Sequence, residues 1–164
     1  MPDIVISDFM DEAVVREAFA GGDVLYDPTL VDRPADLAAA LVDARAVIVR
    51  NRTRVNDALL AAAPQLRAVG RLGVGLDNID LDACRARGVA VFPATGANDT
   101  SVAEYVITAM LILLRRAWFA TPDVIAGKWP RMALIGGEAS GRTLGLVGLG
   151  AIALTSILGR QGLL

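Results

Sequence analysis

Two short polar loops are the part of this sequence best suited to chemistry. Arg50-Asn51-Arg52-Thr53 follows the apolar run 46–49, and Gly70-Arg71-Leu72-Gly73-Val74-Gly75 follows the apolar run 66–69. Both apolar runs have the β-branched composition of buried strands. Ligands bind at the carboxyl ends of the strands in open α/β sheets, so we expect both loops to lie at a ligand site.

The residue types in these loops favour an anionic ligand. Glycines at 73 and 75 allow a tight turn that exposes successive backbone N–H groups, and such a turn forms a small anion cup. Arg52 and Arg71 could add charge-assisted hydrogen bonds to a carboxylate. The alternative is that the glycines only permit the turn and that both arginines are solvated. Asp77 and Asp80 are expected to cap turns and the next helix.

A glycine-rich segment near the end of the sequence resembles the dinucleotide fingerprint G-x-G-x-x-G/A. We expect a strand over 143–147, a tight turn at Gly148, close approach of a pyrophosphate at Gly150 and close packing at Ala153. The helix that begins there would direct its amino terminus at the phosphates. The acidic residue expected about 20 positions further on lies beyond Leu164, so the sequence leaves NAD and NADP open.

Composition excludes several other classes of function. The 164 residues contain no histidine, which excludes within them a histidine-dependent triad, metal site or general base. The single cysteine, Cys84, excludes an internal disulfide and fits a reducing, cytoplasmic compartment. A net charge of −2 with scattered Lys and Arg gives no case for nucleic-acid binding. The apolar run 105–114 is too short to cross a bilayer. We therefore expect no metal, no nucleic acid and no membrane among the partners.

Alternation of short apolar runs with alanine-rich stretches predicts an α/β fold with a parallel, flavodoxin-like sheet. The expected strands are 4–6, 24–26, 46–49, 66–69 and 89–92, and the expected helices are 11–20, 34–44, 56–63 and 81–87. A response-regulator receiver has the same type of fold but needs a phosphoacceptor Asp after the third strand. Arg50-Asn51 stands there instead.

A long helix follows a linker-like stretch over 93–99. Ser101 and Glu104 fit the capping box S-x-x-E, so we expect the helix over 101–117. It is apolar nearly all round, which predicts burial on several sides. Trp118 lies directly before the irregular arm 119–140, and Trp129 lies within it. It is expected either to contact a partner subunit or to pack on its own domain.

Three segments together resemble the D-isomer-specific 2-hydroxyacid dehydrogenases. They are Gly70-Arg71-Leu72-Gly73-Val74-Gly75-Leu76-Asp77-Asn78-Ile79-Asp80, then Asn98-Asp99-Thr100-Ser101-Val102-Ala103-Glu104, then the segment 141–153. Their order and spacing match that family, and the resemblance covers residues 1 to about 153. The phosphoglycerate and sulfolactate dehydrogenases look most similar.

The resemblance implies a division of labour between two parts. Residues 1–98 would be the substrate-binding domain, and 99–164 would be the start of a Rossmann-type NAD(P)-binding domain. The 2-hydroxy or 2-keto acid would be held by Asn51, Arg52, Arg71, Val74 and Gly75. The cofactor, NAD or NADP, would be contacted by Val74, Ala103, Gly148, Gly150, Ala151, Ile152 and Ala153. The long helix and the 119–140 arm would form a homodimer.

The reaction that the resemblance implies is reversible hydride transfer between C2 of the acid and the nicotinamide. The family's catalytic arginine, acidic partner and histidine all follow the glycine motif, so we assign no catalytic residue here. After Ala153 the sequence loses the family pattern, which suggests a truncated cofactor domain. We therefore expect these 164 residues to be inactive alone. The alternative function is a non-catalytic binder of small carboxylates.

Overall fold

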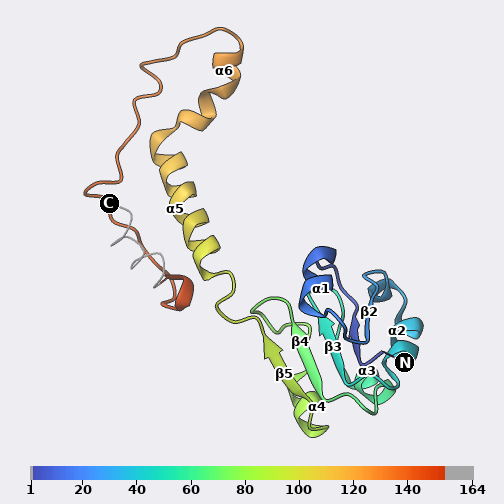
Figure 1. Cartoon of the computed structure of the whole chain (residues 1–164). Helices are drawn as coiled ribbons and strands as arrows, with labels where there is room; N and C mark the ends of the chain where they lie inside the picture. The colour runs from blue at the N-terminus through green and yellow to red at the C-terminus, as the bar shows by residue number, and fades with distance from the viewer. Residues whose placement is uncertain (1, 154–164) are drawn as a thin grey trace. The chain divides into compact units, whose positions relative to one another are not determined.

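The structure is a computed structural model that describes residues 2–153. Its first part is a five-stranded parallel sheet with the strand order β2-β1-β3-β4-β5 (Figure 1). The strands are β1 (Ile4–Ile6), β2 (Val24–Tyr26), β3 (Ala46–Val49), β4 (Ala68–Arg71) and β5 (Ala90–Pro93). The first three have the predicted bounds, whereas β4 and β5 lie two residues and one residue later than predicted. This order confirms the predicted α/β class with a doubly wound, flavodoxin-like sheet.

Helices connect successive strands of this sheet. They are α1 (Glu12–Ala18), the short 3-10 helix η1 (Leu30–Asp32), α2 (Pro34–Leu41), α3 (Asp57–Ala62) and α4 (Leu81–Ala86). Right-handed crossovers place α1 on one face of the sheet and α2, α3 and α4 on the other. The contacts of α3 with both α2 and α4 agree with this arrangement.

Side-chain caps fix where three of these helices begin. Asp11, Asn56 and Asp80 each accept a hydrogen bond from a backbone N–H in the first turn of α1, α3 and α4. Such caps satisfy amide groups that have no partner within the helix. The predicted capping role of Asp80 is therefore confirmed, and it directs the chain from the glycine loop into α4.

The hydrophobic core lies between the sheet and these helices. Val5, Val47 and Val69 are fully buried at equivalent positions of β1, β3 and β4, where the register pairs Val5 with Val47 and Val47 with Val69. Leu41 and Leu60 cover them from α2 and α3. This packing fixes the strand ends, and with them the two polar loops of interest.

The chain divides after Thr95 into two compact units. The second contains α5 (Asp99–Arg115), the 3-10 helix η2 (Ala117–Ala120) and the short helix α6 (Thr121–Ile125). Helix α5 begins two residues before the predicted start and has Asn98 at its N-cap position, so Ser101 lies inside the helix and the predicted capping box is wrong. The helix ends at Arg115, and the next residue, Arg116, adopts the left-handed conformation with φ 58°.

Two predictions about the second unit are not met within the described residues. Helix α5 buries only Ala103, and Tyr105 and Leu113 are exposed, although its composition predicted burial on several sides. Residues 143–147 form no strand. A strand exists only when a neighbouring strand pairs with it, and the described residues of the second unit contain no other strand.

Segment 136–137 passes close to the carboxyl end of α5. The amide of Gly137 donates to the carbonyl oxygen of Leu114 at 2.8 Å. A Cβ at position 136 would lie 2.7 Å from that same oxygen, so only glycine fits there. Among the helices of residues 2–153, none combines the length and apolar character needed to cross a membrane.

Candidate functional site

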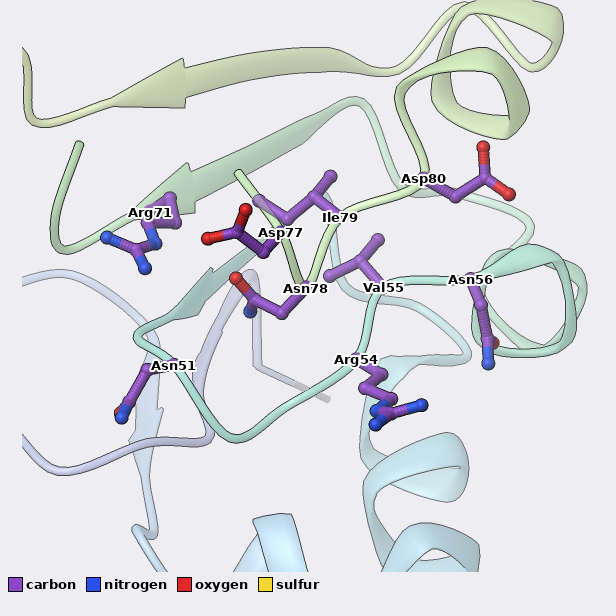
Figure 2. A pocket seen from close by; sticks show the side chains of 9 residues that line it. All are labelled: Asn51, Arg54, Val55, Asn56, Arg71, Asp77, Asn78, Ile79 and Asp80. Atoms are coloured by element: carbon purple, nitrogen blue, oxygen red, sulfur yellow. The ribbon is translucent and has the colours of Figure 1, made fainter. Parts of the chain in front are cut away.

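Two predicted substrate residues, Asn51 and Arg71, line one pocket at the carboxyl edge of the sheet (Figure 2). Asn51 comes two residues after β3, and Arg71 is the last residue of β4. The register pairs Val49 with Arg71, so the two strands end side by side. The pocket has a volume of about 530 Å³ and is completed by Arg54, Val55, Asn56, Asp77, Asn78, Ile79 and Asp80.

The turn after β4 brings the Arg71 side chain against the glycine loop. Gly73 has φ +142°, and a Cβ built on it would overlap the Arg71 guanidinium. A Cβ on Gly75 would lie 3.8 Å from Nη2 of the same group. The carbonyl oxygens of Arg71 and Gly73 both accept from the amide of Ala94, at 3.0 and 3.1 Å. Glycine at 73 is therefore needed for this arrangement of loop and guanidinium, whereas a Cβ on Gly75 would press on Oδ2 of Asp77 at 3.1 Å.

Two successive backbone amides of the glycine loop have no hydrogen-bond partner in the part of the chain that the structure describes. Within residues 2–153 the N–H groups of Val74 and Gly75 have no hydrogen-bond acceptor. The two residues are exposed. Two successive exposed residues without amide partners are compatible with the predicted anion cup, which stays a prediction.

The Arg71 side chain has no counter-ion in the described part of the chain. It is half-buried, and its Nε atom is fully buried with no hydrogen-bond partner there. In Figure 2 the carboxylate of Asp77 points toward the side of the pocket where Arg71 lies, yet the two do not form an ion pair within residues 2–153. A half-buried guanidinium without a partner is costly, because its N–H groups lose water and gain nothing in return.

Arg52 is placed differently from the other predicted substrate residues. Its Nη1 donates to Oδ2 of Asp32 at 3.3 Å, and its Nη2 donates to Oδ1 of the same carboxylate. It lines a second, neighbouring hollow of about 460 Å³ between α2 and α3, together with Thr53 and Arg54. The structure therefore brings Asn51 and Arg71 together at one pocket, while Arg52 is turned toward Asp32. Gly75 lies near the Arg71 guanidinium, but Val74 and Gly75 are not among the residues that line this pocket.

Asn78 is a pocket residue to which the sequence reasoning gave no role. Its Nδ2 donates to the carbonyl oxygen of Thr53 at 2.6 Å, and its Oδ1 is buried without a partner among the described residues. Backbone hydrogen bonds of Val55 to Asn78 and of Asp80 to Val55 join the two loops. The only sequence signal for Asn78 was its place in the Gly70–Asp80 segment.

A buried polar cluster beneath the first loop was also missed. Ser7, Asp8 and Thr53 are the three buried polar side chains of residues 2–153. They lie where β1 and the loop after β3 meet, and hydrogen bonds connect all three. The available signal was the pair Ser7-Asp8 directly after the apolar strand Ile4–Ile6.

The predicted cofactor residues, apart from Val74, belong to the second unit. Ala103 is buried in the second turn of α5. Gly148 adopts φ +91°, as a tight glycine turn requires, and residues 151–153 begin a helix. A Cβ built on Gly148 or Gly150 would meet nothing within 4 Å, so the backbone there is open to approach. The open backbone at this turn is compatible with the predicted pyrophosphate contact, which stays a prediction, and residues 143–147 before the turn form no strand.

The fold and the pocket define the class of protein as an α/β protein with a polar pocket at the carboxyl edge of its sheet. Residues 4–156 match the D-isomer specific 2-hydroxyacid dehydrogenase family, catalytic domain. The chain is 59% identical over 153 residues to the (S)-sulfolactate dehydrogenase of Chromohalobacter salexigens, covering 93% of this chain and 50% of the relative. It is 40% identical over 154 residues to the D-3-phosphoglycerate dehydrogenase of Mycobacterium leprae, covering 93% and 28%.

A solved structure shows the same fold. It is the NAD-dependent formate dehydrogenase from Staphylococcus aureus in complex with NAD, with a TM-score of 0.72 and 23% identity, covering 96% of this chain and 52% of that one. The chain belongs to the D-isomer specific 2-hydroxyacid dehydrogenase family. It spans about half the length of the sulfolactate relative.

Proposed function

We propose that this chain supplies the substrate-binding part of an NAD(P)-dependent oxidoreductase that acts on a 2-hydroxy acid carrying a second anionic group. The observation that carries the proposal is the Arg71 guanidinium, which lines the pocket and has no ion pair within residues 2–153, followed in the glycine loop by the amides of Val74 and Gly75, which have no acceptor in the same residues. Two sets of donors so close along the chain suit a ligand with two anionic ends. Family membership and the 59% identity to a sulfolactate dehydrogenase support sulfolactate as the first candidate.

In this proposal each group of the pocket has a separate task. The amides of Val74 and Gly75 bind the carboxylate, which fixes C2 and its hydroxyl next to the loop. Arg71 binds the distal sulfonate, and Asn51 adds hydrogen bonds from the other side of the pocket. Arg52 can contact the ligand only when its ion pair with Asp32 breaks. Holding both ends of a small acid orients C2 for transfer, and orientation alone can lower a barrier by several kcal/mol.

The cofactor belongs to the second unit in this proposal. Residues 1–98 act as the substrate domain, and 99–164 begin the dinucleotide-binding domain. Gly148, Gly150, Ala151, Ile152 and Ala153 would hold the pyrophosphate, and Ala103 and Val74 would lie near the nicotinamide end. When bound, NAD(P)+ would supply the hydride acceptor for oxidation of C2. The hydroxyl proton would then pass to water or to a general base that we do not assign among these residues, which leaves a 2-keto acid.

We further propose that the second unit carries the surface for homodimerisation. Tyr105 and Leu113 of α5 are exposed, as are Trp118, Ile125 and Trp129 of the following segment. Large apolar side chains gathered on one segment are typical of a surface that a partner covers. Sedimentation velocity on the 164-residue chain tests this, and a monomer at high micromolar concentration would contradict it.

Titration of sulfolactate into the isotope-labelled chain, followed by amide NMR shifts, tests the substrate proposal. Binding should shift the amides of Val74 and Gly75. Arg71→Gln should weaken it by about tenfold or more, because a charge-assisted hydrogen bond contributes about 1.5–3 kcal/mol. Arg67→Gln is the matched control, since Arg67 is exposed and its side chain has no partner within residues 2–153. Equal affinities for both variants would remove Arg71 from the site.

A further inference from the structure

The loop that presents Asn51 and Arg52 is held from below by one buried carboxylate. Asp8 follows β1 and is 3% exposed. Its Oδ2 accepts hydrogen bonds from the backbone N–H of Arg50 at 2.7 Å and from that of Thr53 at 3.2 Å. The two residues between these donors are Asn51 and Arg52, and both are exposed. A single oxygen atom thus spans the loop and leaves its middle facing solvent.

Two further links fasten the same loop. The hydroxyl groups of Ser7 and Thr53 lie 3.0 Å apart in a hydrogen bond, and both residues are buried. The carbonyl oxygen of Thr53 accepts from Asn78 Nδ2. Thr53 therefore connects the strand below to the pocket-lining segment that contains Asn78. Without these acceptors and donors the loop would carry buried backbone groups with no partner, which folded proteins avoid.

Charge also fits a role for Asp8 beneath this loop. Arg50, Arg52 and Arg54 alternate along it and are all exposed. Three cations so close together repel one another, and a buried anion below them offsets that repulsion. A buried carboxylate is costly when it has no partners. Asp8 accepts two amide hydrogen bonds, and these offset the free-energy cost of burying its carboxylate.

From this geometry we propose that Asp8 is a positioning residue for substrate binding, acting through the Arg50–Thr53 loop on Asn51 and Arg52. The proposal rests on the proposed substrate pocket. Asp8 itself is too buried to touch the ligand. Its role is to hold the loop in the conformation that brings Asn51 to the pocket.

Three variants of the 164-residue chain test the proposal, with sulfolactate as the probe and amide NMR as the readout. Asp8→Ala removes the acceptor and should weaken binding by about tenfold or more. Asp8→Asn keeps an oxygen that can accept two hydrogen bonds and removes only the charge, whose effect on the exposed and solvent-screened arginines is small, so it should bind within about threefold of wild type. Asp43→Ala is the control, because Asp43 is exposed. Rescue by asparagine separates loop positioning from a general loss of stability.

Hydrogen exchange provides a second readout that does not depend on the ligand. The amides of Arg50 and Thr53 should exchange faster in Asp8→Ala and remain protected in Asp8→Asn. Should Asp8→Ala not fold, Asp8→Ser replaces it, since the serine hydroxyl is one bond shorter and should not reach the amides of both Arg50 and Thr53, so this variant should weaken binding about threefold or more. Wild-type affinity in Asp8→Ala, or in the variant that replaces it, would overturn the proposal.

The two proposals fail in different ways. If wild-type chain shows no shift at Val74 and Gly75 with sulfolactate, the substrate proposal fails. Asp8 is then judged by exchange alone, and unchanged protection of Arg50 and Thr53 in Asp8→Ala overturns its role. If wild type binds and Asp8→Ala binds equally well, the substrate proposal stands and the positioning proposal is wrong.

Discussion

At the scale of single residues, the two arginines predicted to bind substrate are in opposite electrostatic states. Arg71 has no counter-ion among the described residues, whereas Arg52 is paired with Asp32. A second anion on the substrate would therefore meet Arg71 directly but would compete with Asp32 for Arg52. Arg71 is the stronger candidate for the distal anion, because recruiting Arg52 requires an existing ion pair to break.

Asp32→Asn should therefore strengthen the binding of sulfolactate. Surface ion pairs are worth about 0–1 kcal/mol, so the expected gain is at most about fivefold. Isothermal titration of the two proteins measures it. Asp36→Asn is the control, because it removes a comparable exposed ion pair, that with Arg33. A loss of affinity in Asp32→Asn would show that Arg52 needs Asp32 to be held in place.

At the scale of elements, the turn after β4 depends on a glycine for two separate reasons. Gly73 has a positive φ, and its missing Cβ leaves the space that the Arg71 guanidinium occupies. Gly88, after α4, has φ +68° but a Cβ there would meet nothing within 4 Å. The two glycines are therefore a matched pair for mutation. Both have a positive φ, but only at position 73 would an added Cβ collide with a neighbouring group.

Gly73→Ala should reduce both stability and sulfolactate affinity, whereas Gly88→Ala should reduce stability alone. A residue with a side chain in a positive-φ conformation costs about 1–3 kcal/mol. At position 73 the Cβ must also displace Arg71. Urea denaturation and NMR titration of the two variants separate these effects. Unchanged affinity in Gly73→Ala would mean that Arg71 is not part of the site.

Helix α4 provides a pH-dependent test of the core. Cys84 is fully buried in it, and burial raises the pKa of its thiol, with a smaller contribution from Asp80. The folded state therefore favours the neutral thiol, so the associated stability is complete below the ordinary value of 9.0 and is lost as pH rises through the higher folded value.

Alkylation of Cys84 by iodoacetamide should accordingly be slow at pH 8 and should accelerate with urea unfolding. The free energy of unfolding should fall as pH rises above about 9. Cys84→Ser, which removes the thiol, should flatten this alkaline decline. Rapid alkylation of the native chain would contradict the buried position of α4.

At the scale of the whole molecule, we expect the 164-residue polypeptide to bind sulfolactate without oxidising it. It contains no histidine to accept the hydroxyl proton, and residues 143–147 form no strand that could support a dinucleotide. NADH formation from sulfolactate and NAD+, followed at 340 nm, measures turnover. The same assay on the Chromohalobacter relative is the positive control. Turnover by this chain above the buffer rate would contradict the expectation.

The order of helices and strands could be predicted because it follows from the local pattern of apolar residues along the chain. Apolar runs of three or four residues between alanine-rich stretches indicate buried parallel strands, and β1, β2 and β3 have the predicted bounds. The start of α5 was missed, because Ser101-Glu104 matches a capping pattern that the chain does not use there. A cap forms only where the backbone leaves the helix, and short motifs do not specify that point uniquely.

The sequence by itself determined the fold class, the family and the two loops that carry the candidate site. The fold class and the loops follow from residue types and their spacing along the chain, and the family follows from the resemblance of three motifs. Only the tertiary structure decided that Arg52 forms an ion pair while Arg71 forms none within residues 2–153. It also decided that Asp8 lies under the Arg50–Thr53 loop and that Asn78 joins this loop to the pocket. Those contacts join residues 25 to 42 positions apart. They depend on how parallel strands align, which spacing along the chain does not encode.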